Sequence, residues 1–167
     1  MKKLLIILLA LLMFLTGCAP SAQGLVKPMT FYYLQQTFQY DSESGVIAAE
    51  LRETADCADE IAILQRYFQG PVDPTLQCAF PEATELVALN IQEQSATVTL
   101  TDNIISLSGM DLTVACVCIT KTVIAVTGVE QVTIKAQTQS LGDQGSVTMT
   151  LEDILLIDDS KIVIKPD

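Results

Sequence analysis

The sequence predicts an α+β domain in which two helices pack on one face of a mixed β-sheet. Two stretches, residues 56–69 and 108–126, repeat their apolar residues with the period of a helix. Short stretches rich in β-branched and aromatic residues lie before, between and after them. The resulting order is strand–strand, helix, strand–strand, helix, strand, followed by shorter extended pieces. This order is typical of helices layered on a sheet.

The first eighteen residues predict an export signal rather than part of this fold. Two lysines precede the apolar run Leu4–Leu15, which is shorter than the roughly 20 residues of a membrane-spanning helix. The run ends in Leu15-Thr16-Gly17-Cys18, which resembles the lipobox of bacterial lipoproteins, where the cysteine receives a diacylglycerol. We therefore expect residues 1–17 to be a lipoprotein signal peptide and Cys18 to be the lipid-attachment residue. The alternative is an ordinary secretory signal in which Cys18 has no role.

Residues 18–28 are predicted to be a lipidated tether, because they are small, polar and interrupted by Gly and Pro. Residues 29–167 are then a single domain, which is long enough to bury a core. Its first strands are expected at Thr30–Leu34 and Val46–Arg52, joined by the turn residues Asp41–Gly45 into a hairpin.

The first helix is predicted to span Asp56–Gln69. One face is apolar, through Ile61, Leu64 and Phe68. Asp56 is the expected N-cap, and Gly70-Pro71 is the expected stop, because Gly suits the left-handed position after a helix and Pro cannot continue it.

A loop at Val72–Glu85 is expected to lead into two strands, Leu86–Gln92 and Ala96–Thr101, around the turn Glu93–Ser95. Val98, Thr99 and Leu100 alternate in polarity, which indicates a sheet with one buried face.

Residues Ser108–Val126 give conflicting signals. Their many β-branched residues favour a strand, but their apolar residues step by four and three, as in a helix. These are Leu112, Cys116, Ile119, Val123 and Val126. Ser108 and Asp111 resemble a capping box, Gly128 is a plausible stop, and the stretch is too long for one strand. We therefore predict a helix.

The C-terminal part is predicted to be extended. A strand is expected at Val129–Gln137 and a polar loop at Ser140–Gly145. Short extended pieces follow at Val147–Leu151 and Ile154–Ile157, with a last strand at Lys161–Ile164.

Composition excludes several functions. The chain contains no His, so it has neither the commonest general base nor the commonest metal ligand. The formal net charge is −11, which disfavours binding to nucleic acids. We find no phosphate-binding loop and no nucleophile motif. No catalytic, cofactor or metal site is therefore predicted, and the acidic clusters are interpreted as a helix start and a solvated turn.

Several stretches, in this order, resemble the GerMN domain of spore-germination lipoproteins. They are Phe31–Leu34, Ile63–Pro71 with its Leu-x-x-Gly-Pro ending, Phe80–Leu86, Ala96–Thr101, and Thr122-Val123 with Gly128–Ile134. The resemblance covers about Thr30 to Ala136 and departs from the family pattern at two positions. Ala83 replaces a usual Gly, which puts that turn in doubt, and Thr99 replaces a usual Asp.

The resemblance implies a fold similar to the ring-building motifs of secretion and sporulation complexes, without catalytic residues. It also supports a helix at Ser108–Val126. We therefore expect a lipoprotein at the extracytoplasmic face of the cell membrane, held there through acylated Cys18. It would act non-catalytically, through protein partners of the cell envelope, in sporulation or germination. A small solute-binding lipoprotein is one alternative.

The cysteines raise two further hypotheses. Cys57 and Cys78 flank the first helix, and export makes a disulfide between them possible. Cys116 and Cys118 could form a redox dithiol, which gives a second alternative, a thiol-dependent envelope protein. On a helix, however, their thiols would point about 200° apart, so we interpret Cys116 as a small core residue.

Overall fold

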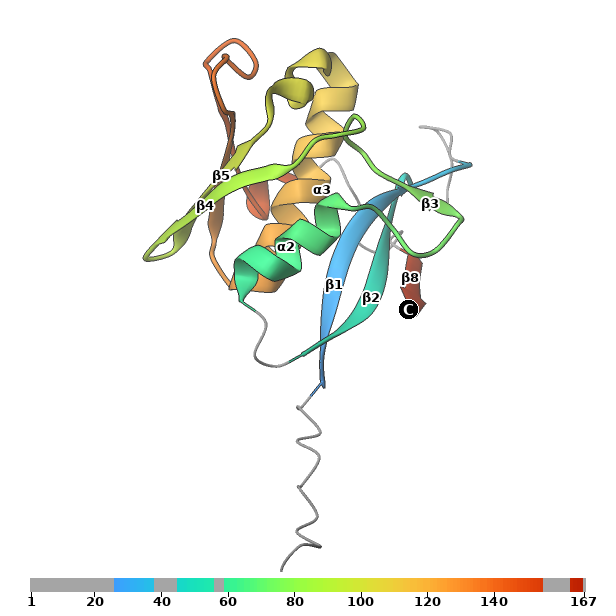
Figure 1. Cartoon of the computed structure of the whole chain (residues 1–167). Coiled ribbons are helices and arrows are strands. Elements are labelled where there is room, and N and C mark those ends of the chain that lie inside the picture. Colours follow the sequence, from blue (N-terminus) through green and yellow to red (C-terminus); the bar gives the residue numbers. More distant parts are fainter. Residues whose placement is uncertain (1–25, 38–44, 56–58, 155–162, 167) are drawn as a thin grey trace, which may run out of the picture.

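The computed structural model describes residues 26–37, 45–55, 59–154 and 163–166, and Figure 1 shows the chain. In these residues, two α-helices combine with two four-stranded sheets. The predicted α+β class with two helices and mixed strand pairing is therefore confirmed. The strands differ from the prediction in forming two sheets rather than one.

The first sheet is built on a long antiparallel hairpin. Strands β1 (Val26–Gln35) and β2 (Ile47–Ala55) pair along nine positions, which confirms the predicted hairpin; its turn lies mostly outside the described residues. The two-residue strand β3 (Leu76–Gln77) pairs with the end of β1, and β8 (Val163–Pro166) pairs in parallel with β2. The strand order is β3-β1-β2-β8.

The second sheet has the order β4-β5-β6-β7. Strands β4 (Leu86–Gln92) and β5 (Ser95–Leu100) form a hairpin, which points away from the helices at the left of Figure 1. Strand β6 (Gln131–Ala136) runs parallel to β5, because helix α3 makes the crossover between them. Strand β7 (Val147–Thr150) returns antiparallel to β6.

Helix α2 (Glu60–Phe68) starts later than predicted. Its N-cap is Asp59, whose Oδ1 accepts a hydrogen bond from the Ala62 N–H at 2.6 Å. The predicted cap at Asp56 is therefore wrong, because Asp59 supplies the same side-chain acceptor nearer the apolar face. The expected stop is confirmed: Gly70 has φ +101°, a backbone conformation that a residue with a Cβ rarely adopts.

Residues Gly109–Thr127 form helix α3. The helix predicted from periodicity is therefore confirmed, and the strand favoured by propensity is not formed. Gly128 ends it in the left-handed conformation, as expected. One half of the expected capping box is not formed: Ser108 occupies the N-cap position but makes no side-chain capping bond. The β-branched Thr113 and Thr127 are accommodated because each hydroxyl donates to the carbonyl four residues earlier.

Helix α3 also explains why two sheets form. The predicted stripe faces one core cluster, where Cys116, Ile119 and Val123 are fully buried. The opposite side of the helix, with Val117 and Cys118, is buried in a second cluster. A helix that is apolar all round has to be covered on both sides, and a single sheet covers only one. This helix is the one described segment long and apolar enough to span a membrane, and here it forms the buried centre of the domain.

Several boundaries differ from the prediction. The first strand begins at Val26, inside the predicted tether, and the predicted loop after α2 contains β3. A 3₁₀ turn, Glu152–Ile154, stands at the start of the predicted extended piece at 154–157, whose other residues lie outside the described part. The last strand lies two residues later than predicted.

Candidate functional site

A buried ion pair on β2 organises one side of the domain. Glu50 and Arg52 are two residues apart on a strand, so their side chains point to the same face. Glu50 is 0% exposed and Arg52 is 8% exposed. The Arg52 Nε donates to Glu50 Oε2 at 2.7 Å. Burying two charges is costly unless they pair and bond further, so the remaining contacts of this pair matter.

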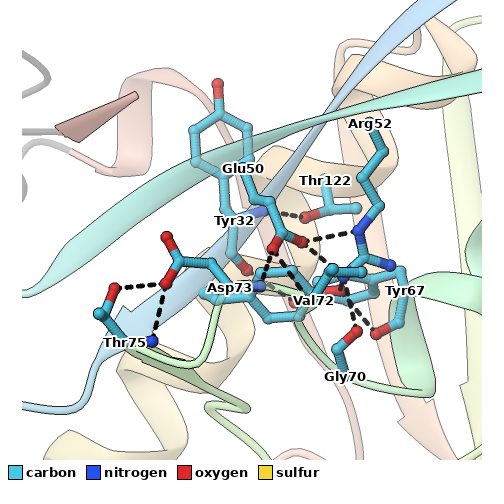
Figure 2. Close-up of polar contacts among 10 residues, drawn as sticks. Tyr32, Glu50, Arg52, Tyr67, Gly70, Val72, Asp73, Thr75 and Thr122 are labelled. Atoms are coloured by element: carbon cyan, nitrogen blue, oxygen red, sulfur yellow. Dashed lines mark hydrogen bonds and ion pairs between the residues drawn. The ribbon is translucent and has the colours of Figure 1, made fainter. Parts of the chain in front are cut away.

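Those further contacts hold the loop that follows α2. Glu50 Oε1 accepts hydrogen bonds from the N–H groups of Val72 at 2.9 Å and Asp73 at 2.7 Å. Arg52 Nη2 donates to the Gly70 carbonyl at 2.7 Å. Figure 2 shows the carboxylate and the guanidinium side by side, with backbone groups of Asp73 and Gly70 directed at them. The pair therefore fixes the conformation of the loop that begins with Gly70-Pro71.

Two tyrosines extend this network to α2. Arg52 Nη2 donates to the Tyr33 hydroxyl at 3.3 Å, and Tyr33 in turn donates to the Tyr67 carbonyl at 3.0 Å. Burial raises the pKa of Tyr33 well above its usual value, although the Arg52 guanidinium acts in the opposite direction. Burial also raises the pKa of Tyr67. Both phenols therefore stay neutral and act as hydrogen-bond donors or acceptors within the packed core.

The open edge of β1 is closed by side chains from both helices. The Tyr32 N–H donates to Thr122 Oγ1 of α3 at 3.0 Å. The Tyr32 carbonyl accepts from the Tyr67 hydroxyl of α2 at 3.2 Å. Backbone groups that no strand satisfies here are thus satisfied by side chains (Figure 2).

The loop ends in an ion pair with the C-terminal strand. Asp73 Oδ1 accepts from the N–H of Thr75 at 2.7 Å and from its hydroxyl at 2.6 Å, and these bonds lower the pKa of Asp73. Lys165 of β8 lies 3.5 Å from Asp73 Oδ2. The network therefore joins β2, the loop after α2 and β8. Sequence reasoning missed it, because the i, i+2 spacing of Glu50 and Arg52 places both on one face of the strand but does not show that the pair is buried.

A polar groove of about 320 Å³ opens between the last turn of α2 and the start of β4. Its lining residues are Gln65, Phe68, Gln69, Ala83, Thr84, Glu85 and Leu86. Thr84 is 2% exposed, and its hydroxyl has no hydrogen-bond partner among the described residues. Ala83 has φ +60°, so the turn keeps the left-handed conformation that the usual Gly of the resembled family would favour.

A second hollow, of about 250 Å³, is mainly apolar and lies between the end of β1 and the start of α3. Its lining residues are Leu34, Cys78, Ala79, Phe80, Pro81, Leu107, Asp111 and Val114. Both hollows are open to solvent. Neither has the enclosed shape of a small-molecule site, so they give no support to a solute-binding role.

The cysteines fall into three groups. Cys18 and Cys57 lie outside the described residues, so lipid attachment and the Cys57–Cys78 disulfide stay predictions. Cys78 is partly exposed, and Cys116 and Cys118 are buried in different core clusters. The last two therefore lie on opposite sides of α3, as expected from their spacing on a helix. In the described part of the chain, no group of three or more potential metal ligands is present.

We expect Cys116 and Cys118 to resist alkylation in the folded protein. Burial raises the pKa of Cys116 to about 12 and that of Cys118 further above its usual range. At pH 8, Cys116 then has on the order of 1000-fold less thiolate than a free cysteine. Maleimide labelling followed by peptide mass spectrometry should modify both only after denaturation. Rapid labelling of Cys116 or Cys118 in the native protein would contradict this and revive the redox alternative.

Comparison with known proteins assigns this chain to a family. The Germane family, described as sporulation and spore germination, matches residues 30–141. No curated protein matches the chain. The structure of the tandem GerMN domains of the sporulation protein GerM from Bacillus subtilis is similar, with a TM-score of 0.55 and 21% identity over 81% of this chain.

The chain spans about half of that tandem structure, 49% of its length. The first GerMN domain of the same protein gives a TM-score of 0.50 at 12% identity, covering 71% of this chain and 91% of that domain. At such identities the likeness shows the fold, while the family match rests on the sequence. The chain belongs to the Germane (GerMN) family of sporulation and spore germination.

Proposed function

We propose that this protein is a lipid-anchored interaction module at the extracytoplasmic face of the cell membrane, which supports the assembly of an envelope complex in sporulation or germination. The family match over residues 30–141 carries the proposal. It is supported by the lipobox-like Leu15-Thr16-Gly17-Cys18 and by the fold shared with GerMN domains. The buried polar network supports a non-catalytic role, because its charged groups bond to one another and to the loop backbone.

The attachment is tested by replacing the acylated residue. We expect Cys18→Ser to abolish incorporation of an alkyne-tagged fatty acid and to release most of the protein from the membrane fraction, because stable anchoring needs two or more acyl chains. The double variant Cys57→Ser with Cys78→Ser is the matched control, since it makes the same chemical change away from the predicted attachment residue, removes both partners of the predicted disulfide, and should leave attachment intact. Wild-type protein that carries no lipid would refute the anchor.

The assembly role is tested in the native host. The protein is crosslinked in its own envelope, in growing and in spore-forming cells where the host forms them, and the bound material is identified. We expect an envelope protein that is recovered with the wild type and lost with Cys18→Ser. Recovery of a small molecule in its place would favour the solute-binding alternative.

A further inference from the structure

Strand β4 is the longest strand at the margin of a sheet. It pairs with β5 on one side, and no other described strand pairs with it. Unpaired edges invite other strands, so proteins shorten, charge or cover them. The other three edge strands are short, charged or capped by a side chain, whereas β4 is long, uncharged and, among the described residues, uncapped.

The protected margins differ from β4 in length and chemistry. Strand β3 has two residues, and β8 has four, including Lys165 and Pro166. Strand β7 has four residues, and Asp153 accepts hydrogen bonds from the N–H and the hydroxyl of Thr150 at its end. The open side of β1 is closed by Thr122 and Tyr67. Each of these features hinders a foreign strand from pairing at that edge.

Strand β4 is neither short, charged nor capped by a described side chain, although helix α2 packs beside it. Its seven residues, Leu-Val-Ala-Leu-Asn-Ile-Gln, include no charge and no proline. In the described part of the chain, no capping side chain bonds to its outer edge. Val87 and Ile91 keep 43% and 41% of their surface exposed. Ile91 pairs with the buried Ala96, so it lies on the core-facing side of the sheet, where an added strand would extend the apolar face.

The charges around β4 indicate the chemistry of the occupant. Glu85 and Glu93 flank the strand at its two ends. The groove at its start includes Glu85 and the C-terminal turn of α2, whose carbonyl groups carry partial negative charge. Arg66 of the same turn is exposed and does not line the groove. No lysine or arginine lines this groove. The surroundings therefore attract a cationic side chain, and the buried Thr84 hydroxyl has bonding capacity left for it or for its backbone.

The same charges disfavour a second copy of this chain as the occupant. In an antiparallel pairing of two β4 strands centred on Leu89, Glu85 of one copy would lie opposite Glu93 of the other. Like charges directly opposite each other across a strand pair are destabilising. A partner with basic side chains opposite Glu85 and Glu93 would instead be attracted at both positions.

We propose that the outer edge of β4 and the adjoining groove bind an extended segment of a partner protein, with alternating apolar residues and at least one lysine or arginine. The segment adds a strand to the second sheet, covers Ile91 and places its basic side chain between the end of α2 and Glu85. Main-chain pairing supplies affinity, and the alternate side chains supply specificity. This inference rests on the proposed function and names the chemistry of the partner.

The test uses the full lipidated protein in detergent micelles and a library of random nine-residue peptides displayed on phage. We expect selection to enrich peptides that alternate apolar residues and contain Lys or Arg. A selected peptide, resynthesised with a fluorophore, should slow hydrogen exchange of the β4 amides. Its affinity should fall at least tenfold with Ile91→Lys and with Glu85→Lys, and a few-fold with Thr84→Val.

Leu151→Lys is the matched control, because Leu151 is 54% exposed and lies outside β4; it should leave the affinity unchanged. Circular dichroism checks the fold of each variant. The inference is overturned if selection enriches acidic or proline-rich peptides or none, if the β4 amides are not protected, or if the protein dimerises through β4.

Fatty-acid labelling of the same preparation separates this failure from that of the proposed function. If the protein is lipidated and its envelope partner still binds after Ile91→Lys, the proposed function stands and the inference about β4 is wrong. If the protein is not lipidated and has no envelope partner, the proposed function itself is wrong.

Discussion

Replacing Glu50 by Gln should destabilise the protein by about 3–5 kcal/mol, because one half of a buried ion pair is removed and the other remains. The amide keeps the shape of the carboxylate, and its oxygen can still accept from the Val72 and Asp73 N–H groups. Its NH₂ group, however, would face the donors of Arg52, which is almost fully buried. Guanidinium-induced unfolding followed by circular dichroism measures the loss.

Glu53→Gln is the matched control, because Glu53 lies on the same strand but is exposed; its effect should stay within about 0.5 kcal/mol. The double variant Glu50→Gln with Arg52→Met should recover part of the loss, since no unpaired charge stays buried. In Glu50→Gln, hydrogen exchange at Val72 and Asp73 should accelerate more than in the rest of the sheet. A loss below about 1 kcal/mol would show that the pair does not hold this loop.

This network also shows where sequence reasoning stopped. The strand that carries Glu50 was predicted, and on a strand two residues at i and i+2 share a face. A charged pair at that spacing is nevertheless usually solvated, whereas here the loop after α2 and the side chain of Tyr33 cover it. Burial came from a contact 22 residues away in sequence, and local pattern contains no information on such contacts.

Helix α3 shows the opposite case, in which pattern outweighed propensity. The stripe from Leu112 to Val126 predicted a helix correctly, because its spacing reflects which residues meet the core. The same stripe led to the expectation of a single covered face. Val117 and Cys118 on the other side are apolar as well, and this second face was the available sign that two sheets enclose the helix.

The sequence allowed the prediction of those features that depend on a few neighbouring residues. The stop at Gly70-Pro71 and the positions of Cys116 and Cys118 on opposite sides of a helix follow from a few neighbouring residues. The groove beside α2 and the unpaired edge of β4 could not be predicted in this way. Both depend on which strand ends the sheet, and strand order is set by long-range pairing that composition does not encode.

Replacing Tyr67 by Ala should destabilise the protein by about 3–5 kcal/mol, the usual loss for a large aromatic residue in a core. Tyr67 is fully buried, and its ring centroid lies 5.0 Å from that of Tyr33, 5.1 Å from Phe68 and 5.5 Å from Phe80. These rings come from β1, α2 and the loop before β4. The truncation therefore opens a cavity where three separate parts of the chain meet.

Tyr67→Phe isolates the hydroxyl from the ring. It keeps the aromatic contacts and removes the hydrogen bond to the Tyr32 carbonyl, so the expected loss is about 1 kcal/mol. Gln65→Ala is the surface control on the same helix, because Gln65 is exposed; it should be nearly neutral. If Tyr67→Phe costs as much as Tyr67→Ala, the closure of the β1 edge, rather than ring packing, is the main contribution of this residue.

The two sites should also be coupled. Arg52 donates to the Tyr33 hydroxyl, which donates to the Tyr67 carbonyl, so the ion pair and the aromatic cluster share a side chain. Residues joined in one network typically show interaction energies of about 0.5–3 kcal/mol. Tyr33→Phe removes the hydroxyl that joins Arg52 to the Tyr67 carbonyl. We therefore expect the loss of stability in Glu50→Gln combined with Tyr33→Phe to differ from the sum of the two single losses, because both changes remove a partner of Arg52. Strict additivity in the same unfolding experiment would mean that the loop and the aromatic core are held independently.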